Sequence, residues 1–197
     1  MTLSRLPVIP SLILLALILI SFFADFLAPY SPYDIDLGNK LKPPFWVGGG
    51  STTHLLGTDL LGRDVLSRLI FGARISLTVA IMGVLLAGSI GVILGVISGF
   101  YGGKIDAIIM RTCDAAISLP IILIALLLAV VFGPSFANLI YIMGLVLWTR
   151  YARVVRGEVL SVKEQEFVAY ARVAGASDLK IMIRHIFPNV VNTLMVL

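Results

Sequence analysis

Charged residues are scarce in this sequence. Asp, Glu, Lys and Arg make up 13% of its 197 residues, against about a quarter in a soluble domain, whereas hydrophobic residues make up 59%. The mean hydropathy is +1.03. This composition excludes an ordinary soluble domain and indicates an integral membrane protein. The net charge of +4 then fits the basic bias of cytoplasmic loops, so we do not expect a nucleic-acid partner.

Several kinds of chemistry lack the residues that they need. Cys113 is the only cysteine, which excludes an internal disulfide and a cysteine-based metal cluster within this chain. We expect it to be a small, buried apolar residue. The two histidines, His54 and His185, fall on opposite sides of the membrane in the topology given below. Each is therefore expected to be a polar surface residue rather than a ligand of a shared metal.

Enzymatic and ion-conducting functions are also unsupported. No apolar stretch offers a serine and a histidine at similar depth, as an intramembrane hydrolase would need. The centres of these stretches carry no ionisable residues, which argues against a channel or a proton-coupled carrier. The phosphate-loop pattern G-x-x-x-x-G-K-[ST] is missing, and the glycine-rich "VGGGSTTH" has no lysine. We therefore expect this stretch to be a flexible loop.

Four apolar stretches are long enough to cross a bilayer, which takes about 20 residues. The sequence predicts spans at 6–27, 75–101, 105–132 and 136–155, and the start of a fifth at 189–197. The fold class is all-α, a polytopic helical membrane protein. Because the fifth stretch is too short to cross, we expect the chain to be truncated. Pro120 is expected to kink the third span, for structural reasons or as part of a gate.

The loops set the orientation. The region 150–189 holds seven Lys or Arg against four acidic residues, so the positive-inside rule places it in the cytoplasm together with residues 1–5. Residues 156–188 then form a cytoplasmic loop. Residues 28–74 form an external loop, in which Pro, Gly, Asp and Asn favour irregular structure.

Two features lie within the predicted spans. Gly91, Gly95 and Gly99 recur at four-residue steps that let helices approach closely, although glycine is also common in membrane helices generally. Asp106, Arg111 and Asp114 cluster at the start of the third span. We expect them to form ion pairs at the cytoplasmic edge, with a role in an inner gate as the alternative.

The cytoplasmic stretch 166–189 has two helical patterns. One apolar stripe comprises Phe167, Tyr170, Ala171 and Ala174, and a second comprises Leu179, Met182, Ile183 and Ile186. The first helix is predicted to end at Gly175 in a left-handed cap. Ser177 is placed to cap the second helix, with Asp178 in its first turn, and Pro188 to stop it. The two helices form either a docking element or an interfacial segment that lies on lipid.

A family resemblance favours docking. "EFVAYARVAGASDLKIMIRHIFPN" resembles the EAA loop of permease subunits in bacterial ABC importers, with Gly175 and Pro188 at the expected interval. Three further blocks resemble the C-type permeases of dipeptide, oligopeptide and nickel importers; they are "HLLGTDLLGRDVLSRLIFGARISL", "GFYGGKIDAIIMR" and "ARVVRGEVLSVKEQEFV". The resemblance covers nearly the whole chain and involves these several separate blocks. One departure is Ala169, which stands where the motif has glutamate; Glu166, one turn earlier, could partly replace it.

The resemblance implies a type I ABC importer permease fold with six spans, in the bacterial inner membrane. It implies no cofactor on this chain, since ATP and Mg²⁺ bind a partner ATPase. It also implies a homologous second permease subunit, an extracytoplasmic substrate-binding protein and surrounding membrane lipid as partners. Peptides are the preferred cargo and nickel is the alternative. The remaining rival is a membrane structural or assembly protein whose amphipathic segment lies on lipid.

The resemblance also assigns the residues that couple to the ATPase. The elbow 175–178 would seat in a groove of that subunit. Ala171 and Ala174 would allow close packing, and Arg172 and Asp178 would make polar contacts at the docking surface. The full predicted set is Glu166, Ala171, Arg172, Ala174, Gly175, Ser177, Asp178 and Pro188. No substrate-binding residue is predicted.

Overall fold

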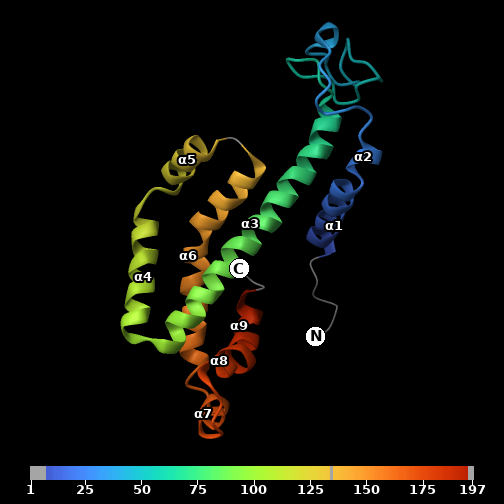
Figure 1. Cartoon of the computed structure of the whole chain (residues 1–197). Coiled ribbons are helices and arrows are strands. Elements are labelled where there is room, and N and C mark those ends of the chain that lie inside the picture. Colours follow the sequence, from blue (N-terminus) through green and yellow to red (C-terminus); the bar gives the residue numbers. More distant parts are fainter. Residues whose placement is uncertain (1–7, 134, 195–197) are drawn as a thin grey trace. The chain divides into compact units, whose positions relative to one another are not determined.

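The computed structural model describes residues 8–133 and 135–194, and these are almost entirely helices and irregular loops (Figure 1). The described residues contain no β-strand, only an isolated bridge between Thr58 and Asp64. This confirms the all-α fold class. The predicted N-terminal segment 1–5 and the last three residues of the chain lie outside the described residues. The chain divides into two compact units, Met1–Val79 and Ala80–Leu197, which are taken in turn.

The first unit contains two short helices, an irregular loop and the start of a long helix. α1 spans Val8–Phe22, α2 spans Ala24–Leu27, the 3-10 helix η2 spans Leu37–Asn39, and α3 begins at Val65. Arg74 of α3 joins these parts. Its Nη2 donates to Asp25 of α2 at 2.8 Å, and its Nε donates to the carbonyl oxygen of Ser21 of α1, also at 2.8 Å. The charge that interrupts the first apolar stretch is therefore paired.

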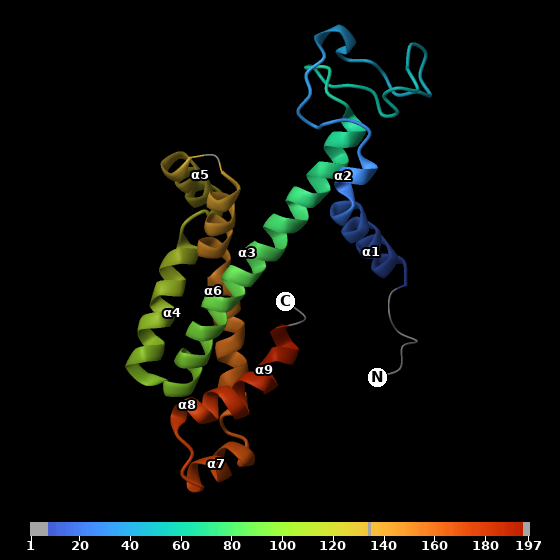
Figure 2. The same ribbon diagram turned by 45° about the vertical axis from the view of Figure 1, so that its right-hand side comes forward.

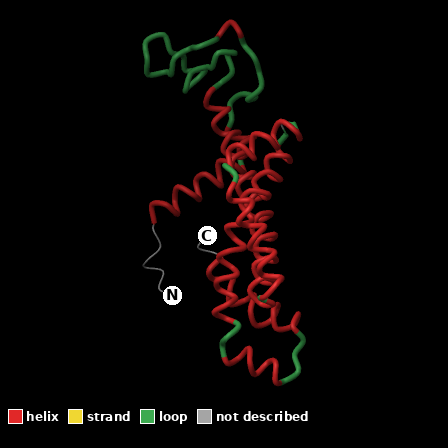
Figure 3. Tube along the Cα trace, turned by 90° about the vertical axis from the view of Figure 1, so that its left-hand side faces the viewer, coloured by secondary structure: helices red, strands yellow, loops and turns green. Residues whose placement is uncertain are grey.

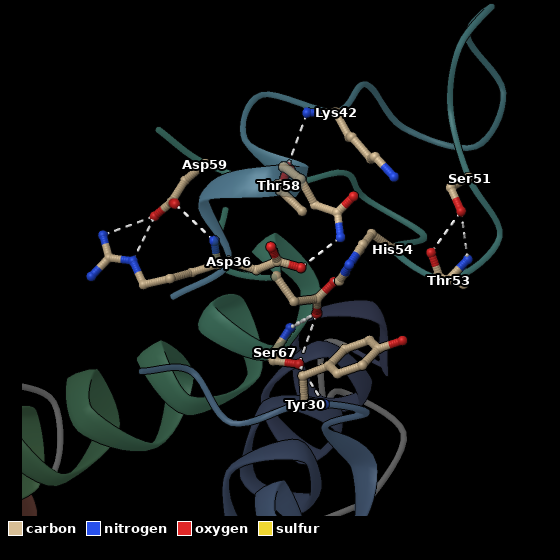
Figure 4. Close-up of polar contacts among 12 residues, drawn as sticks. Tyr30, Asp36, Lys42, Ser51, Thr53, His54, Thr58, Asp59 and Ser67 are labelled. Carbon is tan, nitrogen blue, oxygen red and sulfur yellow. Dashed lines mark hydrogen bonds and ion pairs between the residues drawn. The ribbon is translucent and has the colours of Figure 1, made fainter. Parts of the chain in front are cut away.

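A buried polar network sets the start of α3 (Figure 4). Asp64 Oδ2 accepts from the backbone N–H and the hydroxyl of Ser67, both at 2.7 Å, which is the geometry of a helix N-cap. Asp64 Oδ1 lies 3.0 Å from His54 Nδ1, and Ser67 Oγ accepts from the backbone N–H of Tyr30 at 3.1 Å. The side chain of His54 is only 12% exposed, so the prediction of a polar surface residue is wrong for it.

The loop between α2 and α3 is organised by Asp59 (Figure 4). Its Oδ1 accepts from the backbone N–H groups of Leu61 at 2.8 Å and Arg63 at 3.0 Å, and its Oδ2 accepts from the guanidinium groups of Arg63 and Arg68. Burial alone would raise the pKa of Asp59. The hydrogen bonds from Arg63 and Leu61 outweigh it and hold this pKa well below its usual range. The loop is irregular, as predicted, but it is internally bonded.

The second unit is a set of packed helices (Figure 2). It continues α3 to its end at Tyr101 and then comprises α4 (Gly103–Ser118), α5 (Ile121–Phe132), α6 (Phe136–Val162), α7 (Glu166–Val173), α8 (Asp178–Ile181), the π-helical segment η3 (Met182–Ile186) and α9 (Phe187–Leu194). α5 and α4 each pack against α6. α6 is therefore the central helix of this unit.

The described helices differ in whether they are long and apolar enough to be membrane spans. Among the described helices, α3 with its 37 residues is long and apolar enough to cross a bilayer, and α4 with α5 qualifies if the pair is one span. That pair is bent by 87° at a break that contains Leu119 and Pro120. Pro120 thus kinks the segment as predicted, because its ring fixes φ and removes a hydrogen-bond donor.

The glycines of α3 lie directly against α6. A Cβ added to Gly91 would lie 2.5 Å from the carbonyl oxygen of Trp148, and one added to Gly95 would lie 2.7 Å from that of Ala152. At Gly99 the added atom would lie 2.7 Å from the Cβ of Val159. No real Cβ atom tolerates such distances. The four-residue step therefore marks a close approach of two helices and does not merely reflect the high glycine content of membrane helices.

The prediction that Pro188 stops the second cytoplasmic helix is wrong. The chain runs helically from Asp178 to Leu194, with Pro188 as the second residue of α9. The N–H of Phe187 donates to the carbonyl oxygen of Met182, five residues back, which is a π-turn. This wider turn precedes Pro188 and makes room for its ring, which in a regular helix clashes with the carbonyl four residues back. Asn189 Nδ2 also donates to the carbonyl oxygen of His185 at 2.6 Å.

Candidate functional site

The segment 166–189, here called the coupling loop after the role that the family resemblance predicts for it, is built around a sharp turn at the end of α7. Gly175 has φ +77°, the left-handed conformation that was predicted for it. Its N–H donates to the carbonyl oxygen of Arg172 at 2.9 Å, and the N–H of Ala176 donates to that of Ala171 at 3.0 Å. This pair of bonds is a Schellman motif, which satisfies the last carbonyl groups of the helix. The turn is therefore fixed by backbone bonds as well as by the glycine.

The second helix of the loop begins as predicted. Ser177 is extended, and its Oγ accepts from the backbone N–H of Lys180 at 3.4 Å, while Asp178 lies in the first turn of α8. The carbonyl oxygen of Ser177 accepts from the N–H of Ile181 at 2.9 Å. The elbow thus consists of a glycine cap followed within two residues by a serine cap, and it leaves α7 and α8 as separate short helices (Figure 3).

The inner face of the coupling loop is anchored to α3 and α6. Four fully buried residues of the loop and the start of α9 form one cluster with residues of those two helices; the four are Val168, Ile181, Ile186 and Val190. Ile181 and Ile186 are five residues apart, and they share a face because the π-turn lies between them. The predicted stripes are thus partly wrong. Met182 and Ile186 are buried, but Leu179 and Ile183 are exposed and Ile181 replaces them.

The outer face of the loop carries exposed apolar side chains over a shallow hollow. Tyr170 is 69% exposed and Val173 is 89% exposed. The hollow, of about 560 Å³, is lined by Phe167, Tyr170, Ala171, Ala174, Gly175, Ala176, Lys180, Arg184 and His185. Its lining therefore combines small residues at the elbow with two aromatic rings and two cations. Such a hollow can receive a protein surface that carries apolar and acidic side chains.

The predicted coupling residues fall into two groups. Ala174, Gly175, Ser177 and Asp178 lie at the exposed elbow, and Glu166 lies exposed in the first turn of α7. Ala171 is half-buried against the inner cluster. Arg172 is exposed, but its guanidinium lies 5.5 Å from the centroid of the Phe100 ring of α3, a cation–π contact within the chain. Pro188 lies in α9, beyond the elbow.

Sequence patterns missed the residues that hold the loop in place. Val168 is a single valine on a short helix, and Ile181 stands one position away from the predicted stripe. A stripe drawn at a uniform α-helical period cannot find them, because the π-turn changes the period within the segment. Asp106, Arg111 and Asp114 of α4 were expected to form ion pairs. The two carboxylates pair with α6, Asp106 with Arg156 and Asp114 with Arg153, whereas Arg111 makes no ion pair within the described part of the chain.

Comparison with known proteins identifies the family. Residues 91–197 match the family model described as "Binding-protein-dependent transport system inner membrane component", and residues 4–44 match "N-terminal TM domain of oligopeptide transport permease C". The chain belongs to the family of binding-protein-dependent transport system inner membrane components. The coupling loop lies wholly within the first match. The resemblance found in the sequence motifs is thus confirmed.

Individual members of this permease family are similar over most of the chain. The dipeptide transport system permease protein DppC of Haemophilus influenzae is 38% identical over 93% of this chain, and the protein of the same name in Escherichia coli K12 is 43% identical over 90%. The oligopeptide transport system permease protein OppC of Bacillus subtilis is 37% identical over 98%. The aligned parts cover 62%, 59% and 61% of these relatives, so the chain spans about three fifths of their length.

Proposed function

We propose that this chain is a permease subunit of an ATP-driven importer and that it forms half of a translocation pathway for peptides across the bacterial inner membrane. The observation that carries the proposal is the coupling loop. Its inner face is fixed to α3 and α6 by buried side chains, while its capped elbow and the adjoining hollow are exposed. A rigid projection of this kind, in a family of binding-protein-dependent permeases, suits the transfer of force from another subunit.

The partner in this proposal is a cytoplasmic ATPase that holds ATP and Mg²⁺. The elbow residues Gly175, Ser177 and Asp178 enter its groove, and Glu166 stands in for the acidic residue that Ala169 replaces. Ala171 and Ala174 allow the close approach of α7. Arg172 contacts Phe100 of its own chain through a cation–π interaction, and the exposure of its side chain leaves it open to a docking contact as well. Pro188 acts indirectly, by placing the π-turn that orients α8 and α9.

The proposal includes two further partners and an orientation. A homologous second permease supplies the other half of the pathway, and an extracytoplasmic binding protein delivers cargo to the external loop. The coupling loop and the N-terminus both lie in the cytoplasm, as the basic residues of 150–189 favour. Peptides are the proposed cargo because the similar proteins are named for dipeptide and oligopeptide transport. Nickel gains no support from those names.

A cysteine crosslink tests the docking of the elbow. In a Cys113→Ser background, Ser177→Cys places a thiol at the elbow, and Ser161→Cys places one on an exposed serine of α6 outside the elbow. Membranes that contain the partner ATPase are treated with a bifunctional thiol reagent, with and without nucleotide. We expect a nucleotide-sensitive adduct between Ser177→Cys and the ATPase and a weaker one from Ser161→Cys.

The same experiment distinguishes docking from a segment that lies on lipid. If the position-177 cysteine reacts with lipid-soluble thiol reagents but forms no ATPase adduct, while cysteines of known partners in the same membranes crosslink, the elbow does not dock. The chain would then fit the rival function of a membrane structural or assembly protein. An adduct whose yield is the same with and without nucleotide would show that the elbow contacts the ATPase but does not move with it.

A further inference from the structure

The corner between α3 and α4 is held by polar contacts from α6. α3 ends at Tyr101 and α4 begins at Gly103, so the chain reverses over Gly102 and Gly103, whose φ angles are +64° and +54° (Figure 1). Glycine adopts these left-handed angles without strain. A turn made of two glycines has little stiffness of its own, so its geometry depends on contacts made by the adjoining helices.

Asp106 on α4 is the first of these contacts. Its carboxylate accepts two hydrogen bonds from the guanidinium of Arg156 on α6, from Nε to Oδ1 and from Nη2 to Oδ2, each 2.5 Å long. The same carboxylate accepts from the hydroxyl of Ser98, a fully buried residue of α3. One carboxylate thus joins three helices. A contact with two parallel bonds fixes the angle between the groups as well as their distance.

Lys163 is the second contact. It follows Arg156 by seven residues, two turns along the same face of α6, and its Nζ donates to the carbonyl oxygen of Gly99 at 3.0 Å. That carbonyl lies in the last turn of α3, where helix carbonyls need external donors and where a cation is favoured. Lys163 is also the C-cap of α6, and α7 begins at Glu166. The coupling loop therefore leaves α6 directly from this contact.

The coupling loop touches the same corner from the other side. Phe100, the residue after Gly99, belongs to the buried cluster that contains Val168 of α7 and Ile186 of η3. The Arg172 guanidinium lies over its ring. α6 therefore contacts Gly99, directly before Phe100, and Asp106, six residues after it, while the loop packs on Phe100 itself. A displacement of the loop therefore acts on the end of α3, where α6 is also hydrogen-bonded to it.

We infer that Ser98, Gly99, Asp106, Arg156 and Lys163, here called the corner clamp, transmit the displacement of the coupling loop to α3 and α4. Asp106, Arg156 and Lys163 act as positioning residues. The inference rests on the proposed function, because it needs an ATPase that moves the loop. With the clamp intact, the corner follows α6 and the loop as one body, since packed groups with fixed hydrogen bonds move together. With the clamp broken, the two-glycine turn takes up the displacement, and ATP is hydrolysed with less uptake.

The test uses a second ion pair between the same two helices as its control. Asp114 lies eight residues after Asp106 on α4 and pairs with Arg153 of α6, but the two side chains are 66% and 46% exposed. Asp106→Asn and Asp114→Asn each remove one carboxylate charge. The importer is assembled with its partner subunits in proteoliposomes, and uptake per ATP hydrolysed is measured together with the amount of assembled complex.

We expect uptake per ATP to fall about 2- to 30-fold with Asp106→Asn, the span usual for residues on a coupling path, and to stay unchanged with Asp114→Asn. A purely structural role would lower the amount of complex and leave this ratio unchanged. Lys163→Met provides a second variant should Asp106→Asn fail to assemble, because it removes only the bond to Gly99 and keeps an apolar stem. A normal ratio in every clamp variant that assembles overturns the inference.

Gly175→Val separates this failure from that of the proposed function. If Gly175→Val uncouples uptake while the clamp variants transport normally, docking stands and the clamp is refuted. If Gly175→Val also transports normally, the loop does not couple to the ATPase, and both the proposed function and the clamp inference are refuted. A reduced ratio in both Gly175→Val and Asp106→Asn supports the clamp.

Discussion

At the scale of single residues, Gly175 determines how the chain leaves α7. Glycine adopts its φ of +77° without strain, and asparagine adopts it at little cost. A β-branched residue in this conformation is strained by about 1–3 kcal/mol. An added Cβ would meet no atom within 4 Å, so the strain comes from the backbone alone. We expect Gly175→Val to insert and assemble normally but to abolish ATP-driven uptake, and Gly175→Asn to retain most of it. Uptake by membrane vesicles with matched amounts of subunit checks this; equal uptake by both variants would contradict it.

Asp59 predicts how the external loop responds to acid. Because its pKa is lowered in the folded loop, its ionised form contributes stability that is fully present above the unfolded value, about 3.9, and is lost as the pH falls through the lower folded value. The backbone amides of Leu61 and Arg63 should therefore keep their hydrogen-exchange protection from pH 7 to about 4 and lose it under stronger acid.

Asp59→Asn should lower the protection of the Leu61 and Arg63 amides already at neutral pH, by roughly two- to tenfold, since a neutral amide accepts more weakly than a carboxylate. Exchange measured by NMR or mass spectrometry in nanodiscs provides the readout. Asp34→Asn, at an exposed position of the same loop, is the matched control and should change nothing. Loss of protection in both variants would mean that the loop depends on its total charge.

At the scale of helices, the contact between α3 and α6 leaves no room for a methyl group at Gly95. A Cβ there would lie 2.7 Å from the carbonyl oxygen of Ala152 and 2.8 Å from the Cβ of Val155, whereas one at Gly88 would meet nothing within 4 Å. Gly95→Ala should therefore cost about 1–3 kcal/mol through overpacking, and Gly88→Ala should be neutral or slightly stabilising. Thermal unfolding of the purified subunit checks the pair. Equal melting temperatures would show that α3 and α6 can move apart without cost.

Some helices could be predicted from sequence and others could not, for identifiable reasons. Gly175 and Ser177 were found because a left-handed cap and a serine N-cap are local devices that need only their own neighbours. The start of α3 at Val65 was not predicted because hydropathy marks only the apolar part of this helix, although Asp64, three residues before Ser67, carries the cap signal. The run of helix through Pro188 was missed because a π-turn has no reliable sequence signal.

At the scale of the whole molecule, hydropathy predicted the class of protein but not its internal contacts. The scarcity of charge led to a polytopic helical membrane protein, and several separate motifs led to the permease family, which comparison confirmed. The helices that Asp106 and Asp114 would pair with could not be predicted, because Arg156 and Arg153 lie 50 and 39 residues away. Pairing over such distances depends on how helices pack. The residues that dock on an ATPase remain a prediction from resemblance and exposure.

The buried thiol of Cys113 makes it possible to measure how often α4 separates from α6 in the wild-type chain. The thiol is fully buried, and it packs with Trp148 and Ala152 where α4 lies against α6. A maleimide can reach it only when these helices separate, so the rate of labelling measures how often they do. Since this is the sole cysteine, every labelled molecule reports the same event. The separation of α4 from α6 can thus be followed without any engineered residue.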